Sequence, residues 1–298
     1  MCYVTPDDYR GFPCPSYPEI KLSLVTANDL GRKIQAFQPD SIHISTEGPL
    51  GFAARNFCFQ NSIPFTTAYH TRFPEYVQAR WRIPLSWSYA YLRWFHKPSA
   101  RILTATPTVD AVLSRWGFGE TGRWSRGVDT ELFKPAAGAQ TAHKPTALYV
   151  GRVAVEKNIG AFLDMPFDGE KTVVGDGPQL QDLKRRYPSV RFMGAKRGQE
   201  LADLYAAADV FVFPSKTDTF GLVLLEALAS GVPVAAYPVP GPLDVIGDKG
   251  PGILSDDLAD AAKKALGIPW AFCRDYALQF SWENCTNQFL GNLAPISR

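Results

Sequence analysis

The sequence has few features of a secreted, zinc-binding or membrane-spanning protein. Its 298 residues include five cysteines, scattered and without a CxxC pair. An odd, scattered set favours neither a disulfide framework nor a zinc site, so we expect a reducing, cytoplasmic environment. No apolar run approaches the roughly 18 residues that a membrane-spanning helix needs, and the first residues lack the charged start and apolar core of a signal peptide.

The excess of one charge over the other is also small: 31 lysines and arginines face 29 acids, and the formal net charge is +2. This balance gives no whole-protein argument for nucleic acid, and we expect no nucleic-acid partner. The length suits two domains, and an apolar fraction of 46% is enough for sizeable cores.

The most informative stretch runs from Asp209 to Pro238. Val210 to Phe213 predicts a strand that is buried on both faces, and Pro214 ends it. Gly221 opens an apolar helix, Gly231 suits a left-handed C-terminal cap, and Val234 to Tyr237 predicts the next strand. The order strand, loop, helix, strand indicates half of a parallel α/β sheet.

Two acids in this stretch, Asp218 and Glu226, predict the chemistry. If the helix begins near Thr219, eight residues separate the carboxylates by roughly 12 Å along its axis, a span that suits a nucleotide sugar. The free amides of Thr219, Phe220 and Gly221 would face an anion such as a diphosphate. Glu226 lies among apolar residues and needs a hydrogen-bonding partner, which a ribose diol would supply.

Pro214 to Val234 resembles the PS..E.FGLV.LEA..SG.PV pattern of the retaining GT-B glycosyltransferases of family 4, with Asp218 in place of the commoner first glutamate. This resemblance implies an α/β fold of two Rossmann-like domains that face a cleft. The alternative is an apolar helix with an incidental acid at its start and one satisfied buried glutamate.

A second motif follows the predicted strand Thr146 to Val150. In GRVAVEKN, Gly151, Arg152 and Lys157 match the GR...EK pattern of the family, which implies two cations on the donor diphosphate. Charge that grows on the leaving phosphate needs preorganised neutralisation. No two Asp residues are separated by one position, so the DxD metal motif is absent, and we expect neither a metal nor another cofactor. The resemblance also implies that Gly194 to Lys196 border the nucleobase. An exposed structural pair is the alternative for the two cations.

The first half predicts a βαβαβ order from Ile20, after a Pro-rich start that we expect to be a loop. The first β-α unit that the family fold implies is missing there, and we expect a truncated or mis-started chain. The alternative is that another segment does the work of this unit. His70 follows the predicted strand Pro64 to Tyr69, at the edge where ligands gather. The resemblance implies that His70 contacts the donor sugar, whereas a lone histidine is in general more often structural.

Three regions follow from these patterns. Residues 1–138 would form the acceptor-side domain, 139–269 the nucleotide-sugar domain, and 270–298 a terminal helix that crosses back to the first domain. RGVDTELFKP, from Arg126 to Pro135, resembles the junction between the two halves in the family.

The stretch from Arg80 to Lys97 interleaves aromatic and basic residues, and no acid occurs from Tyr76 to Val109. This pattern favours peripheral contact with an anionic membrane, on its cytoplasmic face. A helix that packs in the core with solvated arginines is an equal alternative. Single-stranded nucleic acid also suits such a pattern, but no RNA-binding motif accompanies it.

The expected activity is that of a metal-independent retaining hexosyltransferase. It would move a sugar from a GDP- or UDP-sugar donor to a hydroxyl acceptor, and the wording of the motifs resembles enzymes that glycosylate diacylglycerol-type lipids. Two alternatives stay open: an enzyme that assembles glycans or polysaccharides, and a catalytically impaired fragment that binds nucleotide sugars.

Overall fold

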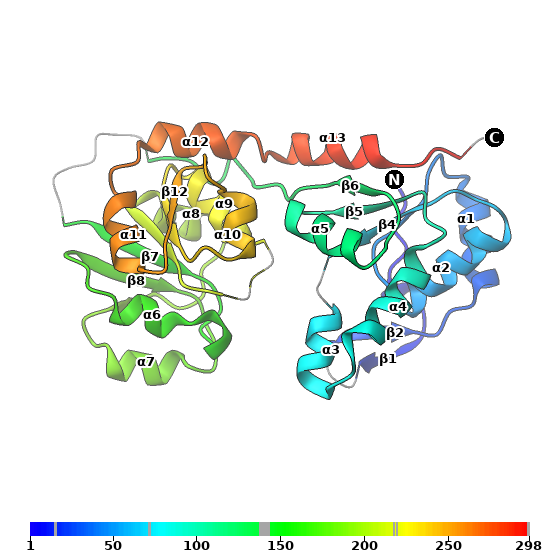
Figure 1. Ribbon diagram of the computed structural model, residues 1–298, viewed down its shortest axis with the longest axis horizontal. Coiled ribbons are helices and arrows are strands. Elements are labelled where there is room, and N and C mark those ends of the chain that lie inside the picture. The colour runs from blue at the N-terminus through cyan, green and yellow to red at the C-terminus, as the bar shows by residue number, and fades with distance from the viewer. Residues whose placement is uncertain (15–16, 71–72, 137–143, 217, 219, 297–298) are drawn as a thin grey trace. The chain divides into compact units, whose positions relative to one another are not determined.

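The structure is a computed structural model that describes residues 1–14, 17–70, 73–136, 144–216, 218 and 220–296. Its contacts divide the chain into two compact units (Figure 1). The first comprises Met1–Ser125 with Asn287–Arg298, and the second comprises Arg126–Thr286. The domain boundary predicted after residue 138 lies among residues 137–143, outside the described part of the chain.

The first unit contains a four-stranded parallel sheet in the order β3-β4-β5-β6. Its strands are β3 His43–Ile44, β4 Thr66–Tyr69, β5 Arg101–Thr104 and β6 Thr121–Arg123. Its helices are α1 Ala27–Phe37, α2 Pro49–Gln60, α3 Phe73–Trp81, α4 Leu85–His96 and α5 Pro107–Arg115. The sequence explains the start of α5, because Thr106 accepts a hydrogen bond from the Val109 amide and Pro107 occupies the first turn.

The prediction for the start of the chain is wrong. Instead of a loop followed by the first strand of a βαβαβ unit, β1 Gly11–Cys14 and β2 Tyr17–Ser23 form an antiparallel two-stranded sheet. A short connection favours antiparallel pairing, whereas a parallel pair needs a long crossover. The parallel sheet therefore begins at β3, and the predicted strand at Ile20 does not belong to it.

The second unit contains a six-stranded parallel sheet in the order β12-β11-β10-β7-β8-β9. Its strands are β7 Thr146–Val150, β8 Glu170–Val174, β9 Arg191–Phe192, β10 Val210–Phe213, β11 Val234–Ala236 and β12 Gly252–Leu254. Its helices are α6 Ile159–Asp164, α7 Leu180–Arg186, α8 Gly198–Ala206, α9 Leu222–Ala229, α10 Pro240–Val245, α11 Leu258–Ala265 and α12 Trp270–Leu278, with α13 Trp282–Asn292 ending the chain's helices. The predicted strands at 146–150, 210–213 and 234–237 are confirmed.

The core of this unit follows from the alternation of side chains along β10. Val210 and Val212 join a buried cluster with Phe162 of α6 and Ala262 of α11. Phe211 points to the opposite face, where its ring lies 5.7 Å from the ring of Tyr205 on α8. Helices therefore cover both faces of the sheet, which is why β10 reads as an uninterrupted apolar run (Figure 1).

The predicted terminal helix is interrupted. α12 ends at Leu278 and α13 begins at Trp282, so the region 270–298, predicted to contain one terminal helix, contains two. At the break, the Val128 amide donates to the Phe280 carbonyl, and Ser281 accepts a hydrogen bond from the Asn284 amide. The first bond satisfies a carbonyl between the two helices, and the second satisfies a free amide in the first turn of α13. Within α13, contacts assign the residues from Asn287 onward to the first unit.

Candidate functional site

The order of strands in the second unit creates a switch point. From β7 the chain adds β8 and β9 on one side, and then returns to place β10 on the other side of β7. Loops that leave the carboxyl ends of two such strands diverge, and ligands of open α/β sheets bind in the crevice between them. A cavity of about 430 Å³ lies there.

Both sequence motifs contribute to this cavity. Its lining consists of Arg126, Tyr149, Val150, Gly151, Arg152, Lys157, Phe213, Ser215, Asp218, Phe220, Gly221, Leu222 and Val223. Six residues predicted for the donor site are thus brought together, although the two motifs lie about sixty positions apart: Gly151, Arg152, Lys157, Asp218, Phe220 and Gly221.

Glycines bring the strand ends close together. Gly175 follows β8, and a Cβ on it would overlap the Gly151 carbonyl after β7. The Gly175 amide donates to the Gly194 carbonyl at 2.8 Å, which extends the contact toward β9. Gly151 and Gly175 have φ values of 153° and 143°, which side chains disfavour. The close approach of three strand ends therefore depends on glycine.

The start of α9 corrects the sequence estimate. Gly221 has a φ of 80° and precedes the helix, which begins at Leu222 and not near Thr219. A left-handed residue cannot continue a right-handed helix, so Asp218 lies in the loop, and the estimate of roughly 12 Å along one helix axis does not apply. The first two residues of α9, Leu222 and Val223, line the cavity, together with Phe220 and Gly221 of the loop before the helix. Thr219 itself lies outside the described residues.

The acid and one of the cations form an ion pair. Lys157 donates from Nζ to Asp218 Oδ1 at 2.5 Å, and both side chains are about three quarters buried, with 25% and 23% exposed. The second oxygen, Asp218 Oδ2, is buried and accepts no hydrogen bond from the described residues. Asn158 supports the pair because its Nδ2 donates to the Pro214 carbonyl, which ties the loop after β7 to the loop after β10.

The charge of the cavity is cationic. Among the described lining residues, Arg126, Arg152 and Lys157 carry positive charge and Asp218 carries negative charge. Arg152 is mainly exposed and lies 3.8 Å from Glu156, a distance and exposure that leave little interaction energy. A net surplus of two positive charges beside helix amides suits a doubly charged anion.

Arg126 is a lining residue that the sequence predictions missed. Burial lowers the pKa of its guanidinium, and the nearby Cys285 acts in the opposite direction. Its motif, RGVDTELF, was interpreted as a junction between domains. The segment that follows Arg126 is fixed by Arg274 of α12. The guanidinium of Arg274 donates to the carbonyls of Thr130 and Phe133. The available signal was an arginine at the start of a motif that resembles the family.

Glu226 has a protein partner in addition to any ligand. The Tyr205 hydroxyl donates to Glu226 Oε2 at 2.8 Å. Burial raises the pKa of Glu226, and the hydrogen bond from Tyr205 lowers it. Burial also raises the pKa of Tyr205 well above its ordinary value, with the charge of Glu226 adding to the effect. Tyr205 therefore offsets part of the desolvation of Glu226 from within the protein, where the sequence prediction named only a ribose diol. Glu226 is not one of the residues that line the cavity.

Three other predicted residues lie outside the lining. Gly194 has a φ of 70° and bonds Gly175 through its carbonyl, and Lys196 pairs with Glu200 at 3.4 Å. His70 belongs to the first unit, where it follows β4 and its ring lies 5.5 Å from that of Trp124.

The first unit carries an aromatic face on α4. Trp87, Tyr91 and Trp94 are 72%, 44% and 46% exposed, and they repeat at helical spacing. The opposite side of α4 is buried through Tyr89, Leu92, Phe95 and His96. Arg55 of α2 stacks its guanidinium 4.1 Å from the ring of Trp94. The helix thus packs in the core on one side, as one prediction had it, and presents aromatic rings on the other. The side chains of Arg80 and Trp81 are outside the described part.

No helix in the described ranges is both long and apolar enough to span a bilayer.

The architecture and the cavity define the class of protein. Each of the two units is built on a parallel α/β sheet, and the second has an anion-suited cavity at a switch point, as expected of the domains of the GT-B fold that the sequence predicted. The model of Glycosyltransferase Family 4 matches residues 4–132, and the model of Glycosyl transferases group 1 matches residues 144–268. The chain belongs to this family of glycosyltransferases.

Similar curated proteins include two glycosyltransferases and a synthase of a glucosyldiacylglycerol. A sulfoquinovosyl transferase of Arabidopsis thaliana is 34% identical over 80% of this chain and 50% of its own. A GDP-mannose-dependent alpha-mannosyltransferase of Mycobacterium tuberculosis is 32% identical over 75% of this chain and 62% of its own. An alpha-monoglucosyldiacylglycerol synthase of Streptococcus pneumoniae is 32% identical over 77% and 59%. The chain spans about half to three fifths of the length of these relatives.

Solved structures confirm the fold. A sucrose-phosphate synthase from Thermosynechococcus elongatus superposes with a TM-score of 0.70 at 25% identity, over 89% of this chain and 75% of its own. The Anabaena protein HepE in complex with UDP superposes with a TM-score of 0.73 at 16% identity, over 89% and 80%.

Proposed function

We propose that this chain is a metal-independent retaining hexosyltransferase. It takes the sugar from a GDP- or UDP-sugar and transfers it to a hydroxyl of a diacylglycerol-type lipid or glycolipid. The observation that carries the proposal is the cavity at the β7/β10 switch point, with three cations, one carboxylate and the start of α9 around it. Membership of the family, and the glycolipid enzymes among the similar proteins, support the same reading.

The charges of the cavity suit the leaving group. Sugar transfer releases a nucleoside diphosphate, and its departing phosphate gains charge as the bond to the sugar breaks. Arg152, Lys157 and Arg126 supply positive charge, and the amides of Leu222 and Val223 supply oriented donors. We assign the diphosphate to this group, and no step in this assignment requires a metal.

The two acids take different parts of the donor. Asp218 has one oxygen on Lys157 and one buried oxygen without a partner among the described residues, so it can accept a hydrogen bond from a sugar hydroxyl. Glu226 keeps Tyr205 as donor and accepts from the ribose diol through its other oxygen. Gly194 to Lys196 border the nucleobase, and His70 contacts the sugar; both assignments rest on the family resemblance.

The reaction is a displacement on one face of the sugar. The bond between the anomeric carbon and the phosphate oxygen breaks, and the acceptor oxygen bonds to the same face, so that the α configuration is retained. The proton of the acceptor hydroxyl passes to the departing phosphate oxygen. The protein supplies orientation and charge in this step.

The aromatic face favours a lipid acceptor over a soluble one. Trp87, Tyr91 and Trp94 suit the interface of a bilayer. Arg93 of the same helix and Lys97 directly after it are exposed and attract anionic lipid. We propose peripheral binding at the cytoplasmic face of a membrane. A soluble glycan or polysaccharide is the competing acceptor class.

An acceptor screen tests the function. Purified protein is incubated with GDP- or UDP-sugars and with dioctanoylglycerol, a glycolipid or an oligosaccharide, with and without EDTA, and the anomeric configuration of the product is read by NMR. We expect an α-linked product on the lipid at an unchanged rate in EDTA. Transfer to the oligosaccharide alone would overturn the lipid acceptor, and UDP or GDP binding with no turnover would indicate an impaired fragment.

Liposome co-sedimentation tests the membrane contact separately. We expect wild-type protein to sediment with anionic vesicles and a Trp87→Ser, Trp94→Ser variant to stay in the supernatant. Trp270→Ser is the matched control, because Trp270 is 59% exposed but lies on α12. Equal sedimentation of all three proteins would count against the aromatic face.

A further inference from the structure

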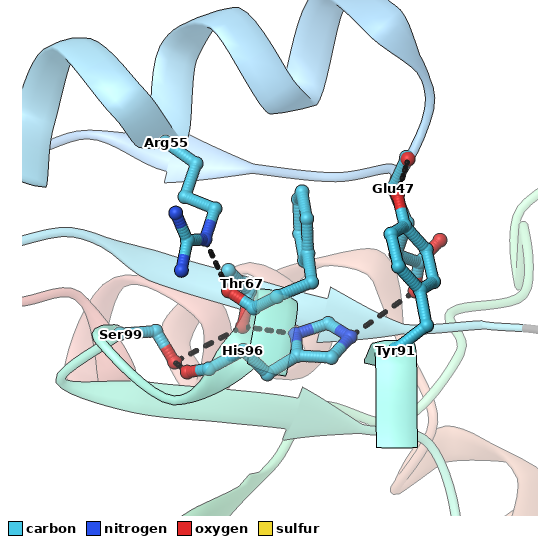
Figure 2. Close-up of polar contacts among 7 residues, drawn as sticks. Glu47, Arg55, Thr67, Tyr91, His96 and Ser99 are labelled. Atoms are coloured by element: carbon cyan, nitrogen blue, oxygen red, sulfur yellow. Dashed lines mark hydrogen bonds and ion pairs between the residues drawn. The ribbon is translucent and has the colours of Figure 1, made fainter. Parts of the chain in front are cut away.

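A row of polar side chains connected by hydrogen bonds lies inside the first unit, apart from the cavity described above. His96 is 1% exposed, and both of its ring nitrogens have partners (Figure 2). Nδ1 lies 2.8 Å from Thr67 Oγ1, and Nε2 lies 3.2 Å from Glu47 Oε1. Ser99 closes the inner end, since its hydroxyl donates to the His96 carbonyl and lies 3.2 Å from that of Thr67.

The inner members of this row are satisfied by the protein itself. A buried imidazole without partners is costly, and the Thr67 hydroxyl removes that cost at Nδ1. A carboxylate only accepts hydrogen bonds, so Nε2 donates to Glu47. The row therefore fixes the direction in which one oxygen of Glu47 points. What it leaves unexplained is the rest of the Glu47 carboxylate, whose side chain is 28% exposed.

The backbone of Glu47 is held as well. The Tyr91 hydroxyl donates to the Glu47 carbonyl at 3.3 Å, as Figure 2 shows. Glu47 thus has its side chain on His96 and its carbonyl on Tyr91, and both partners belong to α4. A loop carboxylate that a helix holds at two points is preorganised, which is the condition for a specific binding group.

The position of Glu47 is that of a ligand residue. It follows β3 by three positions, in the loop that leads into α2. β3 and β4 are parallel, so the loops after them leave the same edge of the sheet, and ligands of such sheets bind beyond that edge. His70, predicted to contact the donor sugar, follows β4 at this same edge.

Glu47 lies next to the aromatic face of Trp87, Tyr91 and Trp94, because Tyr91 contacts it. The Tyr91 hydroxyl donates to the Glu47 carbonyl. Tyr91 is 44% exposed, and its ring lies 6.0 Å from the ring of Trp94. A molecule with an apolar tail on these rings would therefore bring its polar head to Glu47. Arg55 stacks on Trp94 of this face, and the exposed Lys97 directly follows α4. These cations disfavour a head group with a positive charge. A neutral hydroxyl is the group that a carboxylate can still bind there.

We propose that Glu47 is the acceptor-binding carboxylate of this protein, and that it accepts a hydrogen bond from a hydroxyl of a neutral lipid head group such as glycerol. The proposal rests on the proposed transfer to a lipid hydroxyl. His96 and Tyr91 are positioning residues, which act through Glu47. No covalent step is assigned to Glu47.

Glu47→Gln tests the role of the charge, because glutamine keeps the size and still accepts from His96 through its amide oxygen. The probe is dioctanoylglycerol, titrated into the full chain and followed by tryptophan fluorescence. We expect wild type to bind it and the variant to bind it about tenfold to a hundredfold more weakly, the loss typical of a hydrogen bond to a charged group. Tyr91→Phe keeps the ring and should weaken binding by a smaller factor.

A matched control and a second readout separate binding from folding. Glu120→Gln removes an exposed carboxylate of the same unit, which pairs with Arg101, and should leave binding unchanged. Glu47→Gln should bind UDP and GDP with the same affinities as the wild-type protein. Equal binding of dioctanoylglycerol by wild type and Glu47→Gln, or none by wild type, would overturn the proposal. A loss of nucleotide binding and thermal stability together would show that Glu47 is structural. Absence of nucleotide binding in wild type would instead refute the proposed function.

Discussion

Lys157 and Asp218 join the two sequence motifs of the cavity through an ion pair of 2.5 Å. Lys157 ends the short 3-10 helix Val155–Lys157 after β7, and Asp218 lies in the loop after β10. Each therefore has two tasks, since the ammonium that would bind a phosphate also holds the carboxylate that would bind the sugar. Both side chains are partly buried, so the pair is less screened by solvent than an exposed one. Separate substitutions can distinguish the two tasks.

Asp218→Asn should uncouple nucleotide binding from transfer. The change removes the negative charge from the cavity lining, so UDP and GDP should bind equally well or more tightly. The amide cannot serve a sugar hydroxyl and Lys157 as a carboxylate does, so sugar transfer should fall by about tenfold to a hundredfold. Calorimetry and transfer assays measure the two effects. Asp260→Asn, which removes an exposed acid paired with Lys264 on α11, is the control. A parallel loss of both properties would contradict this division of roles.

Lys157→Met should harm both stability and nucleotide binding. Asp218 would lose its ammonium partner, and its other oxygen already has no partner among the described residues. A partly buried charge left unpaired costs about 1–3 kcal/mol, so the free energy of unfolding should fall by that order. UDP and GDP affinity should fall too, because a cation is lost. Restoration of stability, without binding, in the double variant with Asp218→Asn would confirm the cause; a double variant as unstable as Lys157→Met would contradict it.

Arg126→Met should weaken binding of the nucleoside diphosphate. The guanidinium lines the cavity, and burial lowers its pKa. Because a partly desolvated cation interacts more strongly with an anion than an exposed one, we expect about a tenfold loss of UDP or GDP affinity. Arg185→Met, on the exposed side of α7, controls for loss of overall positive charge. Equal affinities in the two variants would remove Arg126 from the site.

Local sequence patterns predicted the strands next to the cavity, but they did not predict which side chains contact one another there. The apolar run from Val210 to Phe213 and the glycine at 221 are local signals, and the structure confirms strand and helix there. The ion pair of Lys157 with Asp218 joins residues 61 positions apart, and Tyr205 reaches Glu226 across 21. Such contacts depend on how the strands are ordered in the sheet, which periodicity does not encode.

Errors in the prediction also have local causes. The estimate of the distance between the two acids assumes a helix that begins near Thr219, whereas the left-handed Gly221 delays the helix to Leu222. The Pro-rich start was interpreted as a loop because prolines interrupt most strands, although edge strands tolerate them. The sequence did not predict a role for Glu47, because a single acid in a turn is a weak signal. Its importance depends on His96, which lies 49 positions away.

Glu226→Gln should change how stability depends on pH. Burial raises the pKa of Glu226 above its ordinary 4.5, so the folded protein holds this proton more tightly than the unfolded chain. This contribution to stability is complete below pH 4.5 and is lost as the pH rises through the raised pKa. Glutamine does not titrate, and it still accepts from Tyr205.

The stability of Glu226→Gln relative to wild type should therefore increase from pH 4.5 upward and level off above the raised pKa. Urea unfolding between about pH 4 and 8 measures it. Glu200→Gln, an exposed change on α8, should show no such trend. A difference that stays constant across this range would mean that the pKa of Glu226 is not raised by burial.

Gly241→Ala should impair donor binding from outside the cavity. Gly241 lies in α10, and a Cβ there would come within 2.8 Å of the Asp218 carbonyl oxygen and 3.3 Å of that of Phe220. Backbone atoms cannot yield as a flexible side chain does, so the loop that carries Asp218 must shift. We expect UDP-sugar or GDP-sugar affinity to fall by about tenfold. Gly267→Ala is the matched control, since its nearest neighbour would be the Lys264 carbonyl at an ordinary 3.5 Å. Because Gly241 offers the ligand no side chain, unchanged affinity in Gly241→Ala would show that the position of the Asp218 loop is not critical for binding the donor.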